Sequence, residues 1–386
     1  MHYSVKFGLN TILPMDTSIT FSQEEQIRYA RHSILPGFGM EAQSRLKSAG
    51  VLVIGAGGLG APLLQYLTAA GVGRIGVIDP DRVALSNLQR QVLFGNGDIG
   101  KLKVEIAAER LRSLNPNVHF DLYPFALQRE NALDIIAKYD LVADGSDNFP
   151  TRYLVNDACV LLGKPLVYGA VFRSEGQVSV FNHLQHEGVR GPNYRNLYPT
   201  PPEPGSVPSC AEGGVLGILP GIIGSLQANE VIKILSGTGE PLSGKLLLFD
   251  AHSGQSRLLR IPQQPPYPIT KLEDYEESCG RPFDAVAEIT PLELQQWAKA
   301  GIPFFLLDVR EPWEFQEYNL GGHLLPLGQI ADKGNQLPHD LPIVVTCQSG
   351  TRSLKAAEML RTQFGYKEVF NLKGGIQACM QQNIAI

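Results

Sequence analysis

Short apolar runs alternate with longer amphipathic stretches through the first half of the chain. The apolar runs have the length of buried strands, and we expect strands at residues 46–54, 74–78, 141–144 and 165–170. The stretches between them have helical length, and we expect helices at residues 61–70, 103–114 and 152–162. This alternation predicts an α/β fold with a Rossmann-like, doubly wound, mostly parallel sheet.

The pattern changes after this first half. Residues 191–208 are polar and rich in proline, so we expect a mobile crossover loop there. Residues 217–235 are apolar and have the length of a helix, and residues 244–250 and 256–261 are expected to be strands. We expect these last two strands to form an antiparallel extension at the carboxyl-terminal side of the sheet.

A proline-rich segment, P-Q-Q-P-P-Y-P, then interrupts the alternation and is expected to be an extended spacer. A second, small α/β domain follows, with strands expected at residues 304–309 and 343–346 and a helix at 353–363. We divide the chain accordingly into an extension, a nucleotide-binding domain, a linker and a small carboxyl-terminal domain: residues 1–20, 21–262, 263–283 and 284–386.

Composition narrows the class of protein. The chain of 386 residues is 44% hydrophobic and 18% charged, as in ordinary globular proteins, and its net charge of −5 favours neither nucleic acid nor an anionic membrane as partner. We expect no apolar stretch to be long enough to span a bilayer, and the first 20 residues lack the pattern of a secretory signal. Five widely spaced cysteines argue against a disulfide framework, so we expect a cytoplasmic protein.

A glycine-rich turn marks the first candidate site. Gly55-x-Gly57-x-x-Gly60 follows an expected strand and precedes an expected helix, with Asp79 about twenty residues further on. Taken alone, this pattern fits an NAD or FAD site, and a glycine turn without any ligand is the structural alternative.

Residues downstream favour a triphosphate over a dinucleotide. Asn87, Arg90 and Lys103 follow the second strand, and two cations at that sheet edge suit a triphosphate better than a pyrophosphate that helix N–H groups already neutralise. Asp147 and Asn148 follow the strand at 141–144, at the same edge, where a carboxylate can hold Mg²⁺ against the phosphates.

A second candidate site lies near the carboxyl terminus. The apolar run at 343–345 leads into Thr346-Cys347, and a tight loop follows, with Arg352 at the start of a helix. Backbone N–H groups of such a loop and a neighbouring arginine stabilise a charged sulfur, so Cys347 is expected to be a reactive thiolate. Four residues separate Cys347 from Arg352, one fewer than in the usual cysteine-based phosphatase loop, and the smaller cradle suits a persulfide.

Several motifs in order carry a family resemblance. R-Y-x-R-H, G-A-G-G-L-G, I-D-x-D, S-N-L-Q-R-Q and D-x-x-D-N resemble the MoeB/ThiF branch of the ubiquitin-activating enzymes, from about residue 21 to 261. C-x-x-G-x-R, together with D-V-R-E at 308–311, resembles a rhodanese domain. The order resembles that of MoeZ-type fusions, which are adenylyltransferase–sulfurtransferases for ubiquitin-like sulfur carriers.

The resemblance implies roles for individual residues. Gly58 should lie against the nucleotide, Asp79 should accept from the ribose hydroxyls, and Asp147 should hold Mg²⁺ transiently. Arg31 resembles a residue that reaches the phosphates from the other protomer, which implies a homodimer; an ordinary surface arginine is the alternative. The remaining nucleotide-binding residues implied by the motifs are Ser86, Asn87, Arg90, Lys103 and Asn148.

The implied reaction joins the two sites. The carboxylate of a carrier protein ending in Gly-Gly attacks ATP to form an acyl-adenylate, and the Cys347 persulfide, charged by a persulfide or thiosulfate donor, turns the activated end into a thiocarboxylate. Cys210 resembles a loop cysteine that bonds covalently to the carrier or its sulfur, although a buried small residue is the alternative. Asp308 and Arg310 either brace the Cys347 loop or form an ordinary surface ion pair. Molybdopterin, thiamine, cysteine and tRNA-thiolation pathways all fit.

The sequence departs from this family in one respect. Most relatives hold a structural zinc with two C-x-x-C pairs, but Asn193-Tyr194-Arg195-Asn196 stands at the first pair and no cysteine lies between residues 261 and 275. Zinc needs four suitable ligands, so we predict no zinc site. Two other functions stay open at this point: an NAD-dependent oxidoreductase with a sulfur-sensing tail, and a scaffold with an inactive adenylylation site.

Overall fold

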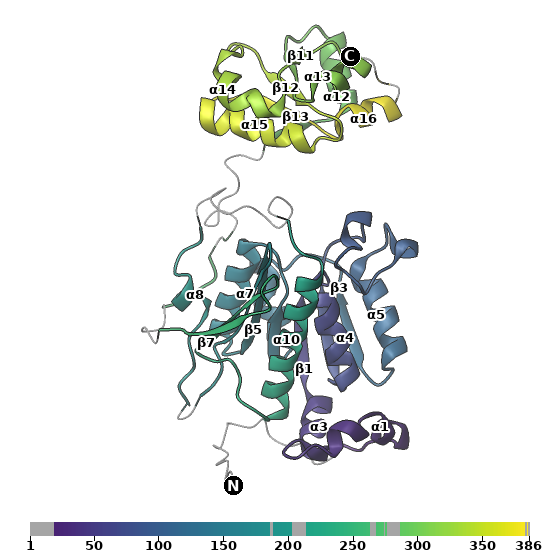
Figure 1. The fold of residues 1–386 in the computed structure, drawn as a ribbon, viewed down its shortest axis with the longest axis vertical. Coiled ribbons are helices and arrows are strands. Elements are labelled where there is room, and N and C mark those ends of the chain that lie inside the picture. The colour runs from purple at the N-terminus through teal and green to yellow at the C-terminus, as the bar shows by residue number, and fades with distance from the viewer. Residues whose placement is uncertain are drawn as a thin grey trace. The chain divides into compact units, whose positions relative to one another are not determined.

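The computed structural model describes residues 19–185, 188–202, 214–262, 268–273, 275, 286–382 and 384. The chain separates into two compact units, Met1–Gly280 and Arg281–Ile386, and each is described by itself. Figure 1 shows a sheet flanked by helices in each unit.

The first unit is built on an eight-stranded sheet of order β3-β2-β1-β4-β5-β6-β7-β8. The five strands from β3 to β5 are parallel, and β6, β7 and β8 continue the sheet in antiparallel fashion. The predicted mostly parallel sheet with an antiparallel extension is therefore confirmed. The strands are β1 (Gly50–Ile54), β2 (Arg74–Ile78), β3 (His119–Tyr123), β4 (Leu141–Asp144), β5 (Leu166–Phe172), β6 (Glu175–Phe181), β7 (Lys245–Asp250) and β8 (Ser256–Arg260).

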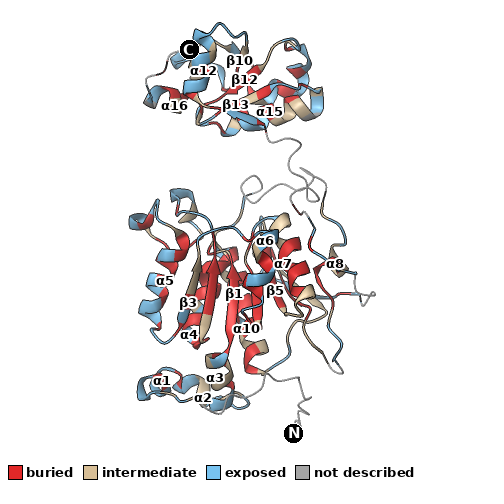
Figure 2. Ribbon diagram, turned by 180° about the vertical axis from the view of Figure 1, so that it is seen from behind, coloured by how far each residue is buried: buried red, intermediate tan, exposed pale blue. Residues whose placement is uncertain are grey.

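Helices cover both faces of the parallel strands, because successive side chains of a strand point to opposite faces. Val51 and Val53 of β1 pack toward α3, α4, α5 and α10, whereas Leu52 and Ile54 pack toward α6 and α7. The buried residues in Figure 2 follow this three-layer arrangement. The helices of this unit include α1 (Gln23–Arg28), α2 (Ala30–Ser33), α3 (Gly39–Ser48), α4 (Gly60–Ala70), α5 (Lys103–Leu114), α6 (Arg129–Ile136), α7 (Phe149–Leu161), α8 (Tyr194–Leu197) and α10 (Ile218–Ser236).

Helix α10 is mostly apolar, with Glu230 and Lys233 as its charged residues. By length and composition it would suffice to cross a membrane, so the expectation that no apolar stretch has that length is wrong. Half of the residues in its most apolar stretch are buried in the protein. A Cβ on its Gly224 would stand 2.3 Å from the Leu59 carbonyl oxygen, which shows how closely α10 packs on the start of α4. Its composition is that of a core helix.

The short helices α1 and α2 lie at the amino ends of the parallel strands. The Tyr29 hydroxyl accepts from Asn115 Nδ2 at 2.9 Å, and the Arg28 guanidinium donates to the Leu114 carbonyl, both just before β3. The Tyr29 ring also lies against Gly71, just before β2. The carboxyl ends of the same strands lie at the opposite edge of the sheet.

The second unit contains a five-stranded parallel sheet of order β11-β10-β12-β13-β9. Helices again pack on two faces: α14 and α15 with one core cluster, and α12 and α16 with the other. The predicted small α/β domain is thus confirmed. Its elements include β9 (Ala287–Ile289), α12 (Pro291–Lys299), β10 (Phe305–Asp308), α13 (Pro312–Glu317), β11 (His323–Leu324), α14 (Ile330–Lys333), β12 (Ile343–Thr346), α15 (Thr351–Phe364), β13 (Val369–Leu372) and α16 (Gly375–Gln381).

Candidate functional site

The glycine turn connects β1 to α4 at the carboxyl edge of the parallel sheet. Gly55 has a φ of +86°, a conformation that side chains disfavour. A Cβ on Gly60 would stand 1.9 Å from the Gly55 carbonyl oxygen, so the first turn of α4 closes directly onto the loop. None of the described side chains caps the start of α4. The free N–H groups of this helix end and its dipole therefore favour an anionic ligand.

A pocket of about 270 Å³ opens at this turn, close to the lower end of the range for small-molecule sites. Six of the eight residues that the sequence assigns to nucleotide binding line it together, although they come from five separate places in the chain. These residues are Gly58, Asp79, Arg90, Lys103, Asp147 and Asn148. The predicted residues therefore converge on one cavity.

Asp79 is held in a defined orientation beneath the pocket. It is buried, and its carboxylate accepts from the backbone N–H groups of Ala56 and Asp81, each at 2.8 Å. Burial raises the pKa of Asp79, while the nearby Lys103 ammonium acts in the opposite direction. A carboxylate fixed by two backbone donors still has free lone pairs, which can accept from ligand hydroxyls.

Two cations enter the pocket from the segment after β2. Lys103, the first residue of α5, is buried, and its Nζ donates to Asp81 Oδ2 at 2.8 Å. Asp81 is largely exposed, so this is a half-buried ion pair at the pocket edge. The Arg90 guanidinium donates to the Ser86 carbonyl at 3.1 Å. Both cations can neutralise phosphate charge.

Two predicted nucleotide ligands, Ser86 and Asn87, lie outside the pocket lining. They belong to a 3₁₀ turn at Leu85–Asn87, where the Asn87 side chain accepts from the Ala84 N–H at 3.1 Å. Because the Ser86 carbonyl also holds Arg90, these residues shape the turn from which Arg90 reaches the pocket. In the structure, Ser86 and Asn87 therefore position Arg90 and do not line the pocket.

Arg31 is placed away from this pocket. It is an exposed residue of α2, at the amino edge of the sheet, whereas the pocket is at the carboxyl edge. Figure 1 shows α1 and α3 at that far end of the unit. Arg31 therefore does not reach the pocket of its own chain, and its proposed role requires a second protomer.

The fit of Mg²⁺ rests on Asp147. Its side chain is exposed in the pocket, while Asn148 caps α7 by accepting from the Thr151 N–H at 2.9 Å. Among the described residues no group of three or more His, Cys, Asp and Glu could hold a metal alone. Mg²⁺ is usually bound through one or two carboxylates plus substrate phosphates, so a single Asp147 fits that mode.

The pocket also contains residues that sequence reasoning missed. Phe125, Ala126 and Leu127 form an apolar wall, and Arg152 of α7 adds a cation stacked over the Phe149 and Tyr168 rings. The wall follows directly after β3. Prediction of that strand would have placed these residues at the same sheet edge as Asp79.

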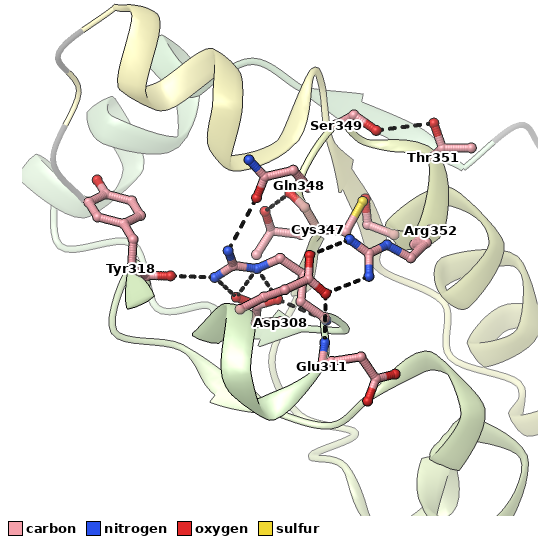
Figure 3. A network of polar contacts seen from close by, with 12 residues as sticks. Asp308, Glu311, Tyr318, Cys347, Gln348, Ser349, Thr351 and Arg352 are labelled. Atoms are coloured by element: carbon pink, nitrogen blue, oxygen red, sulfur yellow. Dashed lines mark hydrogen bonds and ion pairs between the residues drawn. The ribbon is translucent and has the colours of Figure 1, made fainter. Parts of the chain in front are cut away.

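The cysteine cradle belongs to the second unit. Cys347 directly follows β12 and is fully buried. Its Sγ accepts from the Gly350 N–H at 3.2 Å and from the Ser353 hydroxyl at 3.3 Å. Gly350 has a φ of +92°, so the loop turns sharply before α15 begins. The predicted loop around a sulfur, closed by a helix start, is present (Figure 3).

Arg352 has a partner that the sequence did not suggest. Its two terminal nitrogens donate to the two carboxylate oxygens of Glu314 in α13, both at 2.7 Å. This hydrogen-bonded pair lowers the pKa of Glu314 to about 2, because Arg352 favours the ionised carboxylate. In Figure 3 the Arg352 side chain lies beside Cys347. The positive charge of Arg352 near the Cys347 loop is therefore compensated by the Glu314 carboxylate.

Asp308 and Arg310 form a buried pair, not a surface ion pair. Their exposed fractions are 1% and 2%, and Arg310 donates to both carboxylate oxygens. Arg310 also donates to Gln348 Oε1 at 3.3 Å and to the Tyr318 carbonyl at 2.6 Å. Because Gln348 is the residue after Cys347, the pair braces the loop, which was one of the two interpretations from the sequence.

Cys210 and its loop lie outside the described residues. The chain that leads toward it is anchored by Arg195 of α8, whose guanidinium donates to both oxygens of the buried Asp157. The Tyr275 hydroxyl donates to the same carboxylate at 2.7 Å. A buried ionic cluster thus joins α7, α8 and the segment at residue 275, where the family resemblance would place the zinc ligands. That zinc is absent from the protein stays a prediction from the sequence.

Residues 29–268 match the ThiF family, and residues 290–382 match the rhodanese-like domain. The chain belongs to the ThiF family. It is similar to a probable adenylyltransferase/sulfurtransferase, MoeZ, of Mycobacterium tuberculosis, with 45% identity over 97% of this chain and 98% of the relative. A sulfur carrier protein adenylyltransferase of Thermus thermophilus is 55% identical over 67% of this chain and 98% of its own length.

Mouse MOCS3, an adenylyltransferase and sulfurtransferase, is 41% identical over 95% of this chain and 87% of its own. Among solved structures, E. coli MccB with ATP has a TM-score of 0.54 at 21% identity, covering 63% of this chain and 74% of that one. This likeness concerns the fold. As a member of the ThiF family with a rhodanese-like domain, the protein is an adenylyltransferase and sulfurtransferase.

Proposed function

We propose that this chain adenylylates the carboxyl-terminal glycine of a ubiquitin-like sulfur carrier and then converts it to a thiocarboxylate. The observation that carries the proposal is the pairing of two sites in one chain. The first unit holds a cation-lined pocket at a glycine turn, and the second holds a buried cysteine that accepts two hydrogen bonds. The names of the relatives, among them a sulfur carrier protein adenylyltransferase, support the same substrate class.

In the first step, the carrier carboxylate attacks the α-phosphate of ATP, and pyrophosphate leaves. The carboxylate is already ionised at neutral pH, so no general base is needed. Gly58 lies against the nucleotide, Asp79 accepts from the ribose hydroxyls, and Arg90 and Lys103 neutralise phosphate charge. Positioning and charge compensation supply most of the catalysis in this type of reaction. Asp147 would hold Mg²⁺, which would neutralise phosphate charge, and Asn148 lies beside it in the pocket lining.

In the second step, the outer sulfur of the Cys347 persulfide attacks the carbonyl carbon of the acyl-adenylate, and AMP leaves. A second thiolate then attacks Cys347 Sγ, so the S–S bond breaks and its electron pair remains on the new thiocarboxylate. Cys210 is the proposed second thiol, and the resulting disulfide is reset by a cellular dithiol. The sulfur arrives from a protein persulfide or from thiosulfate. The protein acts as a homodimer, in which Arg31 completes the phosphate site of the partner.

The test uses the full-length protein, a carrier ending in Gly-Gly, ATP, Mg²⁺ and thiosulfate. Cys347→Ala is expected to abolish the thiocarboxylate, detected by mass spectrometry, and to leave carrier-dependent ATP–pyrophosphate exchange intact. Lys103→Met is expected to lower that exchange by at least tenfold and to leave sulfur transfer from thiosulfate to cyanide unchanged.

Lys101→Met is the matched control, because Lys101 is exposed and lies outside the pocket lining. Equal loss of exchange in both lysine variants, or a thiocarboxylate formed without Cys347, would refute the assignment. The NAD-dependent alternative predicts no pyrophosphate exchange at all, and the relatives are named transferases.

A further inference from the structure

The hydroxyl of Ser353 faces three acceptors. Ser353 is the third residue of α15 and is fully buried. Its Oγ lies 2.7 Å from Asn371 Oδ1, 3.1 Å from the Gly350 carbonyl oxygen and 3.3 Å from Cys347 Sγ. A serine has one hydroxyl proton and donates one strong hydrogen bond at a time. The three acceptors therefore compete for the same proton.

The charge on sulfur decides that competition. A neutral thiol or a sulfur within an S–S bond is a weak acceptor, so the proton goes to the short contact with Asn371. A thiolate is an anion, and hydrogen bonds to ionised groups are about twice as strong as neutral ones. When Cys347 Sγ becomes a thiolate, the Ser353 hydroxyl rotates and keeps its proton. Its hydrogen bond then points to the sulfur instead of Asn371 Oδ1.

We propose that Ser353 stabilises the Cys347 thiolate as the leaving group when a persulfide on Cys347 gives up its outer sulfur. Asn371 holds the same hydroxyl while sulfur is neutral. This inference rests on the sulfur-transfer half of the proposed function and adds a positioning residue to it. The sequence motif that ends in Arg352 does not include Ser353.

The need for such a donor follows from the cradle. In the described part of the chain, Sγ receives two hydrogen bonds, one from the Gly350 N–H and one from Ser353. The Arg352 guanidinium is held by Glu314 through both terminal nitrogens. The Gly350 N–H is fixed in the backbone, so the Ser353 hydroxyl is the one of the two donors that can reorient as charge develops.

Discharge to cyanide isolates this step, because it needs neither ATP nor carrier. Cyanide carbon attacks the outer sulfur of the persulfide, and a C–S bond forms as the S–S bond breaks. The electron pair of the S–S bond moves to Cys347 Sγ, which leaves as the thiolate, and thiocyanate is released. In the loading step, the Cys347 thiolate is the nucleophile and attacks the sulfane sulfur of thiosulfate. The S–S bond of thiosulfate breaks, and sulfite leaves with the electron pair of that bond.

The experiment compares full-length Ser353→Ala with wild type in single-turnover loading from thiosulfate and discharge to cyanide. Discharge of the variant is expected to be about tenfold slower, the lower range for one hydrogen bond to a charged group. Loading at alkaline pH, where the thiol is fully ionised, is expected to be unchanged or faster, because the thiolate has lost a hydrogen bond. The pH profile of iodoacetamide alkylation at Cys347 is expected to move to higher pH.

Two further variants separate hydrogen bonding from packing. Ser349→Ala is the matched control, since Ser349 lies in the same loop but is exposed and contacts Thr351. It is expected to discharge like wild type. Asn371→Leu removes the competing acceptor and is expected to discharge at or above the wild-type rate.

Equal slowing of loading and discharge in Ser353→Ala would overturn the proposal, and so would unchanged discharge. A tenfold loss of discharge in Asn371→Leu would likewise refute the exchange of acceptors. A failure of the carrier reaction leaves this cyanide assay untouched, so the two proposals fail separately.

Discussion

The ionic cluster around Asp157 provides a quantitative test of how the first unit is held together. The Asp157 carboxylate is 1% exposed, and four donors reach it: Arg195 Nε at 2.9 Å, Arg195 Nη2 at 2.7 Å, Tyr275 Oη at 2.7 Å and Asn156 Nδ2 at 2.9 Å. Burial and the neighbouring carboxylate raise the pKa of Tyr275, so its phenol stays protonated and donates.

The perturbation is Arg195→Met, which removes the compensating charge and keeps an apolar stem of similar length. Removing one partner of a buried pair costs about 3–5 kcal/mol, because the other charge remains buried. Tyr275 and Asn156 still donate to Asp157, so we expect the low end, about 3 kcal/mol. The double variant Arg195→Met/Asp157→Leu leaves no buried charge and is expected to cost less than about 1.5 kcal/mol.

The assay can assign this loss to one unit. Both tryptophans, Trp297 and Trp313, lie in the second unit. In urea titrations, tryptophan fluorescence therefore follows the second unit, while far-UV circular dichroism follows both. With a slope of roughly 3 kcal/mol per molar urea, the first-unit transition should move down by about 1 M, and the fluorescence transition should stay in place. A shift below about 0.3 M, or a double variant as unstable as the single one, would refute the reasoning.

Three further predictions concern other contacts. Gly60→Ala should destabilise the first unit by more than about 2 kcal/mol in urea titrations followed by circular dichroism, because its Cβ would stand 1.9 Å from the Gly55 carbonyl oxygen; a neutral substitution would contradict this geometry. Glu314→Gln should lower the stability of the second unit at pH 6 by about 1–2 kcal/mol, measured by tryptophan fluorescence, since Arg352 is partly exposed and solvent weakens the pair. The folded pKa of Glu314 is depressed to about 2, from 4.5, so its contribution is complete above pH 4.5 and is lost as the pH falls toward 2; the gap between variant and wild type should close over that window, and a gap that widens there would be inconsistent with the pair. Mixing inactive Arg31→Ala and Arg90→Ala subunits should restore part of the pyrophosphate exchange, because one mixed pocket regains both arginines; exchange that stays at the level of either variant alone would argue against a shared site.

Local patterns predicted much of the fold. Both ends of β2, α5 and β12 fall where the sequence placed them, because each is a short apolar run or an amphipathic stretch with clear limits. Strand β3 was missed: it lies at the edge of the sheet, and His119 and Asp121 interrupt its apolar residues. Edge strands bury less surface, so their pattern is weaker.

The residues of the candidate site also differ in how far local sequence predicts them. Gly58, Asp79 and Arg90 belong to compact motifs, and the fold brings them to one pocket. Glu314 and Arg352 are 38 residues apart, and so are Asp157 and Arg195. No local pattern links such partners, because the contact exists only after separate elements have packed. Sequence reasoning therefore predicted the residues that line the candidate site more readily than the residues that hold them in place.

The position of α10 in the fold has a consequence for biosynthesis. The five parallel strands are complete at Phe172, but the helix that packs on α4 and β5 is complete only at Ser236. A chain emerging from the ribosome amino terminus first thus presents a formed sheet on which the apolar surface that α10 covers is still exposed, followed by the apolar helix itself. We therefore expect chaperones to bind the nascent chain mainly while residues 172–236 are being made. Fragments truncated within these residues should aggregate.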